Sequence, residues 1–158
     1  MCIRDRSKAY QAYSLKINGK KSLFRVAKTT GDRPGQFVTL WKRPEIEIGP
    51  FDLSDEIEFV IVSACSPRSL EGKEKRGYFV FDQKILLKKG IFSEEKESKK
   101  GKLGFRVFPP WSEEFIRVNP IKTQRMSVSA KTSQKWQVKC YAQFEDVLLF
   151  LKLLRQVE

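Results

Sequence analysis

The stretch "YSLKINGKKSLFRVAK" (residues 13–28) decides the fold class of this chain. Apolar residues alternate with polar ones up to Ile17, as in a strand with one buried face. The pair Asn18-Gly19 follows, and these residue types accept the positive φ angles of a two-residue hairpin turn. A second apolar run comes directly after the pair. The sequence therefore predicts a β-hairpin at the start of a sheet.

Four more segments have the composition of strands. "QFVTLWKR" (residues 36–43) carries apolar residues on both faces, which is typical of a central strand, and "EIEFVIVSAC" (residues 56–65) repeats that signature. "GYFVF" (residues 77–81) predicts a short strand. "KLGFRVFPPW" (residues 102–111) predicts another, which the proline pair ends because proline cannot donate to a strand ladder.

Helical signals occur at two places. In "DQKILLKKG" (residues 82–90), Asp82 can cap a short helix and Gly90 can stop it. From about Ser127 onward, apolar residues recur at helical spacing, which predicts one long or two consecutive amphipathic helices: Trp136, Cys140, Phe144, Leu148 and Leu151. The expected fold is α/β (α+β), a single domain over residues 8–158 with a central mixed sheet of about five strands flanked by helices.

The chain of 158 residues is long enough for one core. Its net charge of +12 indicates nucleic acid, nucleotide phosphate or an anionic membrane surface as partner, or else solubility alone. The longest apolar runs fall short of the roughly 20 residues that span a bilayer. Three cysteines without paired spacing fit a reducing compartment, so we expect a cytoplasmic protein.

Residues 1–7, which begin "MCIRDR", continue into no strand or helix pattern. They resemble the translated adapter sequence found at the start of some metagenomic reading frames. We expect these residues to be a non-native leader that takes no part in the fold.

The usual signatures of an enzyme are absent from the sequence. There is no histidine, no phosphate-binding glycine loop, and no acidic-x-Lys motif within a strand pattern. We therefore expect a protein without catalysis and without a cofactor. The alternative is a metal-dependent nuclease in which Asp52 and Asp55 hold Mg²⁺ and Lys28 or Lys42 stabilises charge; helix capping and loop solvation also explain the two acids.

Cations within apolar runs suggest an anion site. Arg25 in "LFRVA" and Arg106 in "GFRVF" are each explained by an ion pair, by snorkelling at a sheet edge, or by a bound anion. The loop "TTGDRPG" (residues 29–35) is either an anion-binding nest or a tight turn. All three tryptophans have cations nearby in sequence; such interleaving suits nucleic acid, although core packing explains each ring as well.

Several blocks resemble the MepB-like family of bacterial proteins. They are "FRVAKTT", "GQFVTLWKR", the pattern P-x-D-x-S-D-x-x-x-F from Pro50 to Phe59, "FVFDQKILLKKGI", "RVFPPW" and "KTSQKWQ", in that order. The resemblance runs from about residue 10 to residue 145. It implies a restriction-endonuclease-like sheet flanked by helices and an N-terminal helical segment ahead of the hairpin. It implies no assigned biochemical activity, only linkage to a multidrug-efflux gene cluster.

Within the blocks that resemble the family, the positions that we single out are mainly cationic, polar and aromatic residues. The residues we predict to bind an anion or nucleic acid are Arg25, Lys28, Gln36, Thr39, Trp41, Lys42, Arg43, Arg106, Trp111, Lys131, Gln134, Lys135 and Trp136. The main hypothesis is a non-catalytic protein that binds nucleic acid or a nucleotide-like anion. The alternatives are the nuclease above, with Mg²⁺, and an interaction protein that uses the apolar run "VLLFLKLL" (residues 147–154).

Overall fold

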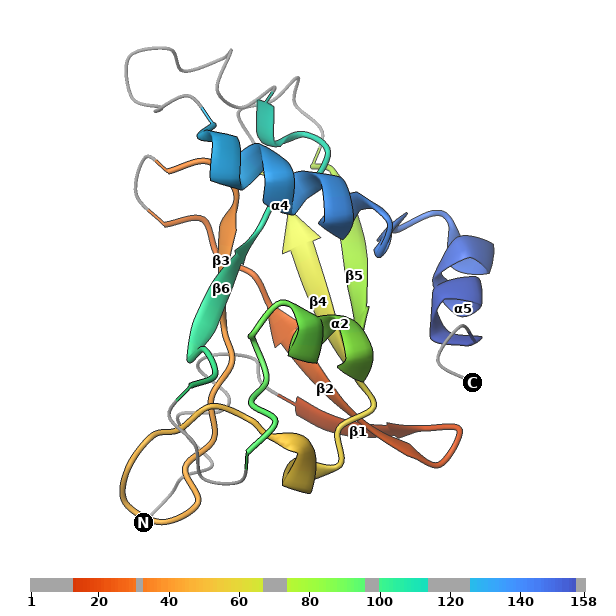
Figure 1. The fold of residues 1–158 in the computed structure, drawn as a ribbon. Coiled ribbons are helices and arrows are strands. Elements are labelled where there is room, and N and C mark those ends of the chain that lie inside the picture. Colours follow the sequence, from red (N-terminus) through yellow and green to blue (C-terminus); the bar gives the residue numbers. More distant parts are fainter. Residues whose placement is uncertain (1–12, 31–32, 67–73, 96–99, 114–125, 156–158) are drawn as a thin grey trace.

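The computed structural model describes residues 13–30, 33–66, 74–95, 100–113 and 126–155, so residues 1–7 lie outside the described part. A five-stranded sheet in the order β1-β2-β4-β5-β7 forms the centre of the molecule (Figure 1). Its strands are β1 (Tyr13–Ile17), β2 (Lys20–Val26), β4 (Phe59–Cys65), β5 (Arg76–Asp82) and β7 (Tyr141–Gln143). Strands β2 and β4 are parallel and the other neighbours antiparallel, which confirms the predicted mixed sheet. This order is compatible with a restriction-endonuclease-like topology.

The predicted hairpin is present as β1 and β2. Tyr13 pairs with Phe24 and Ile17 with Lys20, which leaves Asn18 and Gly19 as the turn. Their φ angles are +51° and +76°. Asn and Gly accept such angles more readily than most residues, so the pair favours this register of the hairpin.

The segment predicted as a central strand belongs instead to a separate two-stranded sheet. It forms β3 (Gln36–Thr39), which pairs antiparallel with β6 (Gly104–Val107). Val38 on one face is fully buried, whereas Phe37 on the other is 38% exposed. The prediction was wrong because an apolar residue on each face does not prove that both faces are covered.

Besides the helical residues Ser112 and Glu113, four helical segments have described bounds. They are the 3₁₀ helix η1 (Leu53–Asp55), α2 (Gln83–Lys88), α4 (Val128–Val138) and α5 (Val147–Arg155). Asp82 caps α2, since its Oδ1 accepts a hydrogen bond from the Ile85 amide at 2.7 Å, as predicted. The two consecutive helices near the C-terminus are also present. The short strand β7 between them was not predicted.

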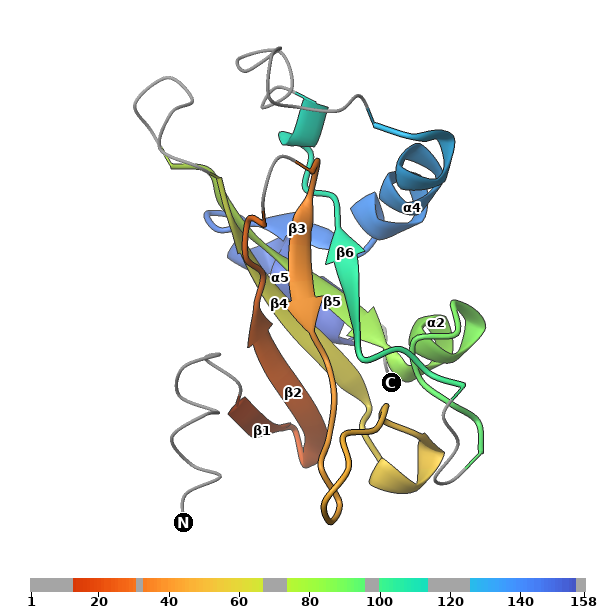
Figure 2. The ribbon, with the colours of Figure 1, turned by 90° about the vertical axis from the view of Figure 1, so that its left-hand side faces the viewer.

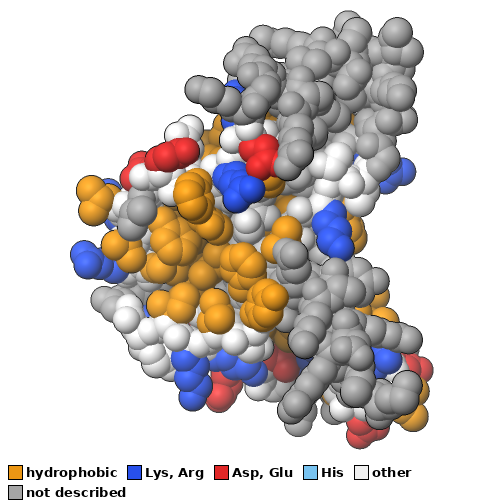
Figure 3. Space-filling model, turned by 180° about the vertical axis from the view of Figure 1, so that it is seen from behind, with side chains coloured by type: hydrophobic (Ala, Val, Ile, Leu, Met, Phe, Trp, Pro, Cys, Tyr) orange, Lys and Arg blue, Asp and Glu red, His pale blue; other side chains and the backbone are white. Residues whose placement is uncertain are grey.

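The two faces of the central sheet are covered differently. On one face, α2, α4 and the β3-β6 ribbon pack over a large core that includes Val60, Phe79, Phe81 and Leu86 (Figures 1 and 2). On the opposite face, α5 packs on β5 and β7 over a smaller cluster. Apolar side chains gather on this side of the molecule (Figure 3). No helix in the described residues is long and apolar enough to cross a membrane.

Candidate functional site

A pocket of about 500 Å³ opens where α4 passes β6. Four cationic side chains line it: Arg33, Lys89, Lys102 and Arg106. No described carboxylate lies among its lining residues. The remaining lining residues are apolar or neutral: Pro34, Ile91, Gly104, Phe105, Phe108, Ser127, Ser129, Ala130, Ser133, Trp136 and Gln137.

The start of α4 is well defined. Ser127 caps the helix, and its Oγ accepts a hydrogen bond from the Ala130 amide at 3.1 Å. At about 100° per residue, Ser129, Ser133 and Trp136 fall on one side of the helix, toward the pocket. The sequence of α4 therefore places two hydroxyls and an indole ring along one wall.

Gln137 fixes α4 against β6. Its side chain is buried, and its Oε1 accepts a hydrogen bond from the Phe108 amide at 2.7 Å while its Nε2 donates to the Arg106 carbonyl at 2.9 Å. A buried amide with both ends satisfied holds two elements in one arrangement. The wall of the pocket is thereby built on rigid secondary structure.

Arg106 holds the loop at the rim of the pocket. Its guanidinium donates to the carbonyls of Arg33, Pro34 and Gly35 and to the Thr30 hydroxyl, at 2.9 to 3.2 Å. Desolvation and the positive charge of Arg33 both lower the pKa of Arg106. Two like charges thus lie close together at the rim. A bound anion would offset their repulsion.

Lys89 is held at the pocket by an aromatic ring. Its Nζ lies 5.2 Å from the centroid of the Trp136 ring, in a cation–π contact. That ring also packs against the core, where the centroid of the Phe81 ring lies 5.6 Å from its own. Among the described residues, Lys89 has no ion pair with a carboxylate. Its ammonium is available to a ligand.

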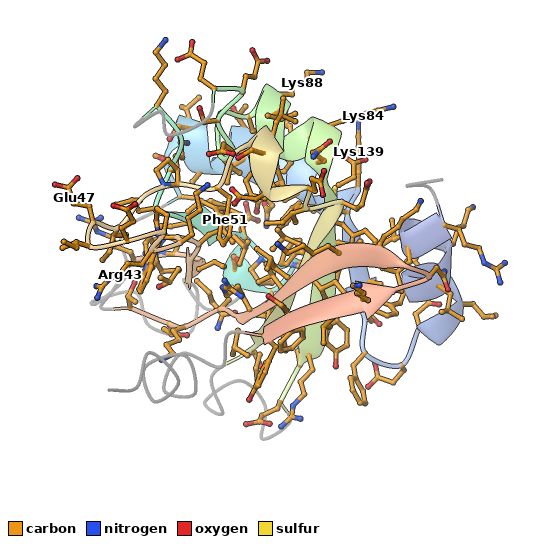
Figure 4. All side chains as sticks on the ribbon, turned by 90° about the horizontal axis from the view of Figure 1, so that it is seen from below. Arg43, Glu47, Phe51, Lys84, Lys88 and Lys139 are labelled. Atoms are coloured by element: carbon orange, nitrogen blue, oxygen red, sulfur yellow. The ribbon has the colours of Figure 1, made fainter. Side chains whose placement is uncertain are left out.

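A row of lysines on α2 and α4 adds positive charge outside the pocket. We call this set the lysine face and define it as Lys84, Lys88, Lys131, Lys135 and Lys139. All five are exposed. Figure 4 shows Lys84, Lys88 and Lys139 pointing away from the same side of the molecule. Residues 83–92 and 127–143 contain no Asp or Glu, so no acid of either segment neutralises the face.

Four of the predicted anion-binding residues lie around β2 and β3. Arg25 donates to the Phe24 carbonyl at 2.9 Å, and burial lowers its pKa to about 10. Lys28 is exposed and forms a backbone bridge with Phe37. Gln36 is buried, donates to the Cys65 carbonyl at 2.7 Å, and leaves its Oε1 without a partner among the described residues. Thr39 ends β3 opposite Gly104. None of the four lines the pocket.

Trp41 and Arg43 contact each other after β3. The Arg43 guanidinium carbon lies 5.8 Å from the centroid of the Trp41 ring. Figure 4 shows Arg43 and Glu47 in the same loop. Trp41 is half-buried and Arg43 exposed, and neither lines the pocket.

Lys42, Asp52 and Asp55 form a cluster around the start of η1. The Lys42 Nζ lies 2.8 Å from Asp52 Oδ2 and 2.6 Å from Asp55 Oδ2. Asp52 also accepts hydrogen bonds from the Ser54 amide and hydroxyl, and Asp55 accepts from the Asp52 amide. Burial alone lowers the pKa of Lys42, but the two carboxylates outweigh it and the pKa lies above its ordinary value.

The bonding of this cluster is that of a capping box with a lysine counter-ion. Asp52 is 1% exposed, and its carboxylate is bonded on both oxygens. The described residues contain no group of three acidic, Cys or His side chains that could hold a metal ion. The arrangement accounts for both acids as structural groups.

The remaining predicted residues, in β6, after it and in α4, divide into four groups. Trp111 is buried in the core, edge-on to Tyr141. Gln134 donates to the Pro109 carbonyl at 3.3 Å and supports α4. Lys131 and Lys135 belong to the lysine face. Trp136, together with Arg106, lines the pocket.

The sequence did not single out Arg33, Lys89, Lys102 or the serines at the start of α4. Arg33 and Lys102 lie outside helices and strands, and Lys89 is the C-cap of α2. One weak feature of the sequence could have indicated the site. Three short segments, residues 83–92, 102–111 and 127–143, carry cations and aromatic residues and lack acids altogether.

Comparisons with known proteins agree on one family. The family model described as MepB-like matches residues 4–143. The solved structure titled "Crystal Structure of MepB" is similar over 87% of this chain and 80% of that chain, with 25% sequence identity and a TM-score of 0.69. None of the curated proteins matches the chain.

Proposed function

The chain belongs to the MepB-like family, and we propose that it binds nucleic acid through the lysine face and the pocket between α4 and β6. The observation that carries this proposal is the absence of acids from residues 83–92 and 127–143, which contain α2 and α4. These segments carry five exposed lysines, and the pocket has four cations at its lining. Phosphate groups of a nucleic acid strand are the ligand that such a surface fits best.

The spacing of the lysines favours a strand over a single small anion. Lys131 and Lys139 are eight residues apart on or beside α4, which corresponds to about 12 Å along the helix axis. Phosphates of one strand advance by about 3.4 Å each along a duplex axis, so this row spans several of them. Lys84 and Lys88 add a second row on α2.

Solubility alone does not explain how the charge is distributed. Mixed-sign pairs occur elsewhere on the surface, for example between Arg76 and Glu74 and between Lys100 and Glu95. Such pairing is typical of a solvated surface. The lysine face departs from that pattern, since residues 83–92 and 127–143, which carry it, contain no acid.

The salt dependence of oligonucleotide binding tests this function. If the protein neutralises about four phosphates, affinity should fall about 100-fold between 50 and 200 mM salt, because each contact releases counter-ions. Fluorescence anisotropy with labelled single-stranded and duplex DNA and RNA measures this directly. Absence of binding at 50 mM salt, or affinity that does not change with salt, would contradict the proposal.

A further inference from the structure

We infer that the pocket holds one unpaired nucleotide of the bound strand, so that the protein binds single strands more tightly than duplexes. This inference rests on the proposed nucleic-acid binding and specifies what enters the pocket. Its volume of about 500 Å³ lies within the range of about 300 to 1,000 Å³ that holds one small ligand. A duplex is too wide to enter such a pocket.

The inner part of the pocket suits a flat, apolar ring. Ile91, Phe105 and Phe108 line it, carry no charge and are at most 7% exposed. The half-buried Trp136 adds an indole. Nucleobases gain free energy from contact with aromatic side chains irrespective of their identity.

The outer part of the pocket suits a phosphate. Arg33 and Lys102 are exposed at its lining, and Lys89 is fixed over Trp136. Ser129 and Ser133 add hydroxyls from the first turns of α4, where backbone dipoles also favour negative charge. The cations at the outer part would contact the phosphate of a nucleotide, and the aromatic residues at the inner part would contact its base.

The base must be unpaired to use this arrangement. In a duplex, each base is stacked on its neighbours and bonded to its partner, so entry into a pocket requires the cost of unstacking and unpairing. In a single strand the bases are unpaired and less firmly stacked, so most of that free-energy cost does not arise. The lysine face contacts phosphates in either case, so duplex binding remains but without the contribution of the pocket.

The test compares a pocket variant with a matched variant on another side of the same helix. Ser133→Trp should fill the pocket, whereas Thr132→Trp adds the same ring at an exposed position that does not line it. The wild-type protein should bind a single-stranded oligonucleotide about tenfold more tightly than a duplex of equal length. Ser133→Trp should lose this preference, and Thr132→Trp should keep it.

Competition with small molecules tests the pocket without any substitution. Adenosine monophosphate should displace part of the single-strand signal from the wild-type protein, and inorganic phosphate at equal concentration should not. Equal affinity for single strand and duplex without competition by the nucleotide would overturn the inference and leave the proposed function standing. Equal competition by phosphate would also overturn it. Failure to bind either nucleic acid would overturn the proposed function as well.

Discussion

Reversal of three charges on α4 should abolish most of the affinity for nucleic acid. The triple variant Lys131→Glu, Lys135→Glu and Lys139→Glu replaces three phosphate-binding cations with anions on one exposed side of the helix. We expect oligonucleotide affinity at 50 mM salt to fall about 100-fold or more, because attraction is lost and repulsion is added. The slope of log affinity against log salt should shrink by about 3.

A variant of equal net charge is the control for this experiment. Lys16→Glu, Lys21→Glu and Lys152→Glu alter exposed residues of β1, β2 and α5, away from the lysine face. Each reversal removes two charges, so both triple variants lower the net charge from +12 to +6. If the two variants lose affinity equally, net charge rather than the lysine face drives binding. Circular dichroism checks that both remain folded.

Lys42→Met should destabilise the fold by about 3 kcal/mol. The substitution keeps most of the side-chain volume but leaves the buried carboxylate of Asp52 and the nearby one of Asp55 without their shared ammonium. Removal of one partner from such a pair typically costs about 3 to 5 kcal/mol. The lower end applies because the Lys42 side chain is 20% exposed. Urea unfolding followed by circular dichroism measures the change.

Lys100→Met is the control for Lys42→Met, because Lys100 forms an exposed ion pair with Glu95. Their charged atoms lie 3.4 Å apart, but the side chains are 78% and 67% exposed. Lys100→Met should therefore change the free energy of unfolding by less than about 1 kcal/mol. If Lys42→Met and Lys100→Met unfold at the same urea concentration, the cluster around η1 does not stabilise the protein as described.

The positions of the main strands along the chain could be predicted from local patterns. The hairpin follows from Asn18-Gly19, and β4 and β5 follow from continuous apolar runs. Local patterns do not determine which strands pair. The assignment of β3 to a separate sheet with β6 depends on contacts across about seventy residues, since Phe37 faces Arg106.

The strand β7 was missed for a related reason. Trp136, Cys140 and Phe144 fit a helical repeat, but α4 ends at Val138 and residues 141–143 pair with β5. Gly77 on β5 permits this pairing, because the Tyr141 ring occupies the space where a larger residue would carry its Cβ. A three-residue strand has too short a pattern to be recognised without its partner.

The candidate site was predicted in part. Lys131, Lys135 and Trp136 lie where the proposed interface is, and Arg106 lies at the pocket through its bonds to the loop of residues 33–35. The guanidinium of Arg25 instead donates a hydrogen bond to the Phe24 carbonyl. A cation within an apolar strand run does not reveal from sequence whether a carbonyl, a carboxylate or a ligand will satisfy it.

The most direct test of nucleic-acid binding is to map the contact surface by NMR. Backbone amide shifts of the ¹⁵N-labelled protein would be followed while a single-stranded oligonucleotide is added at 50 mM salt. The proposed function predicts the largest changes in α2, α4 and β6, with little change in β1 or α5. Changes centred on the hairpin or on α5, with α4 unaffected, would contradict it.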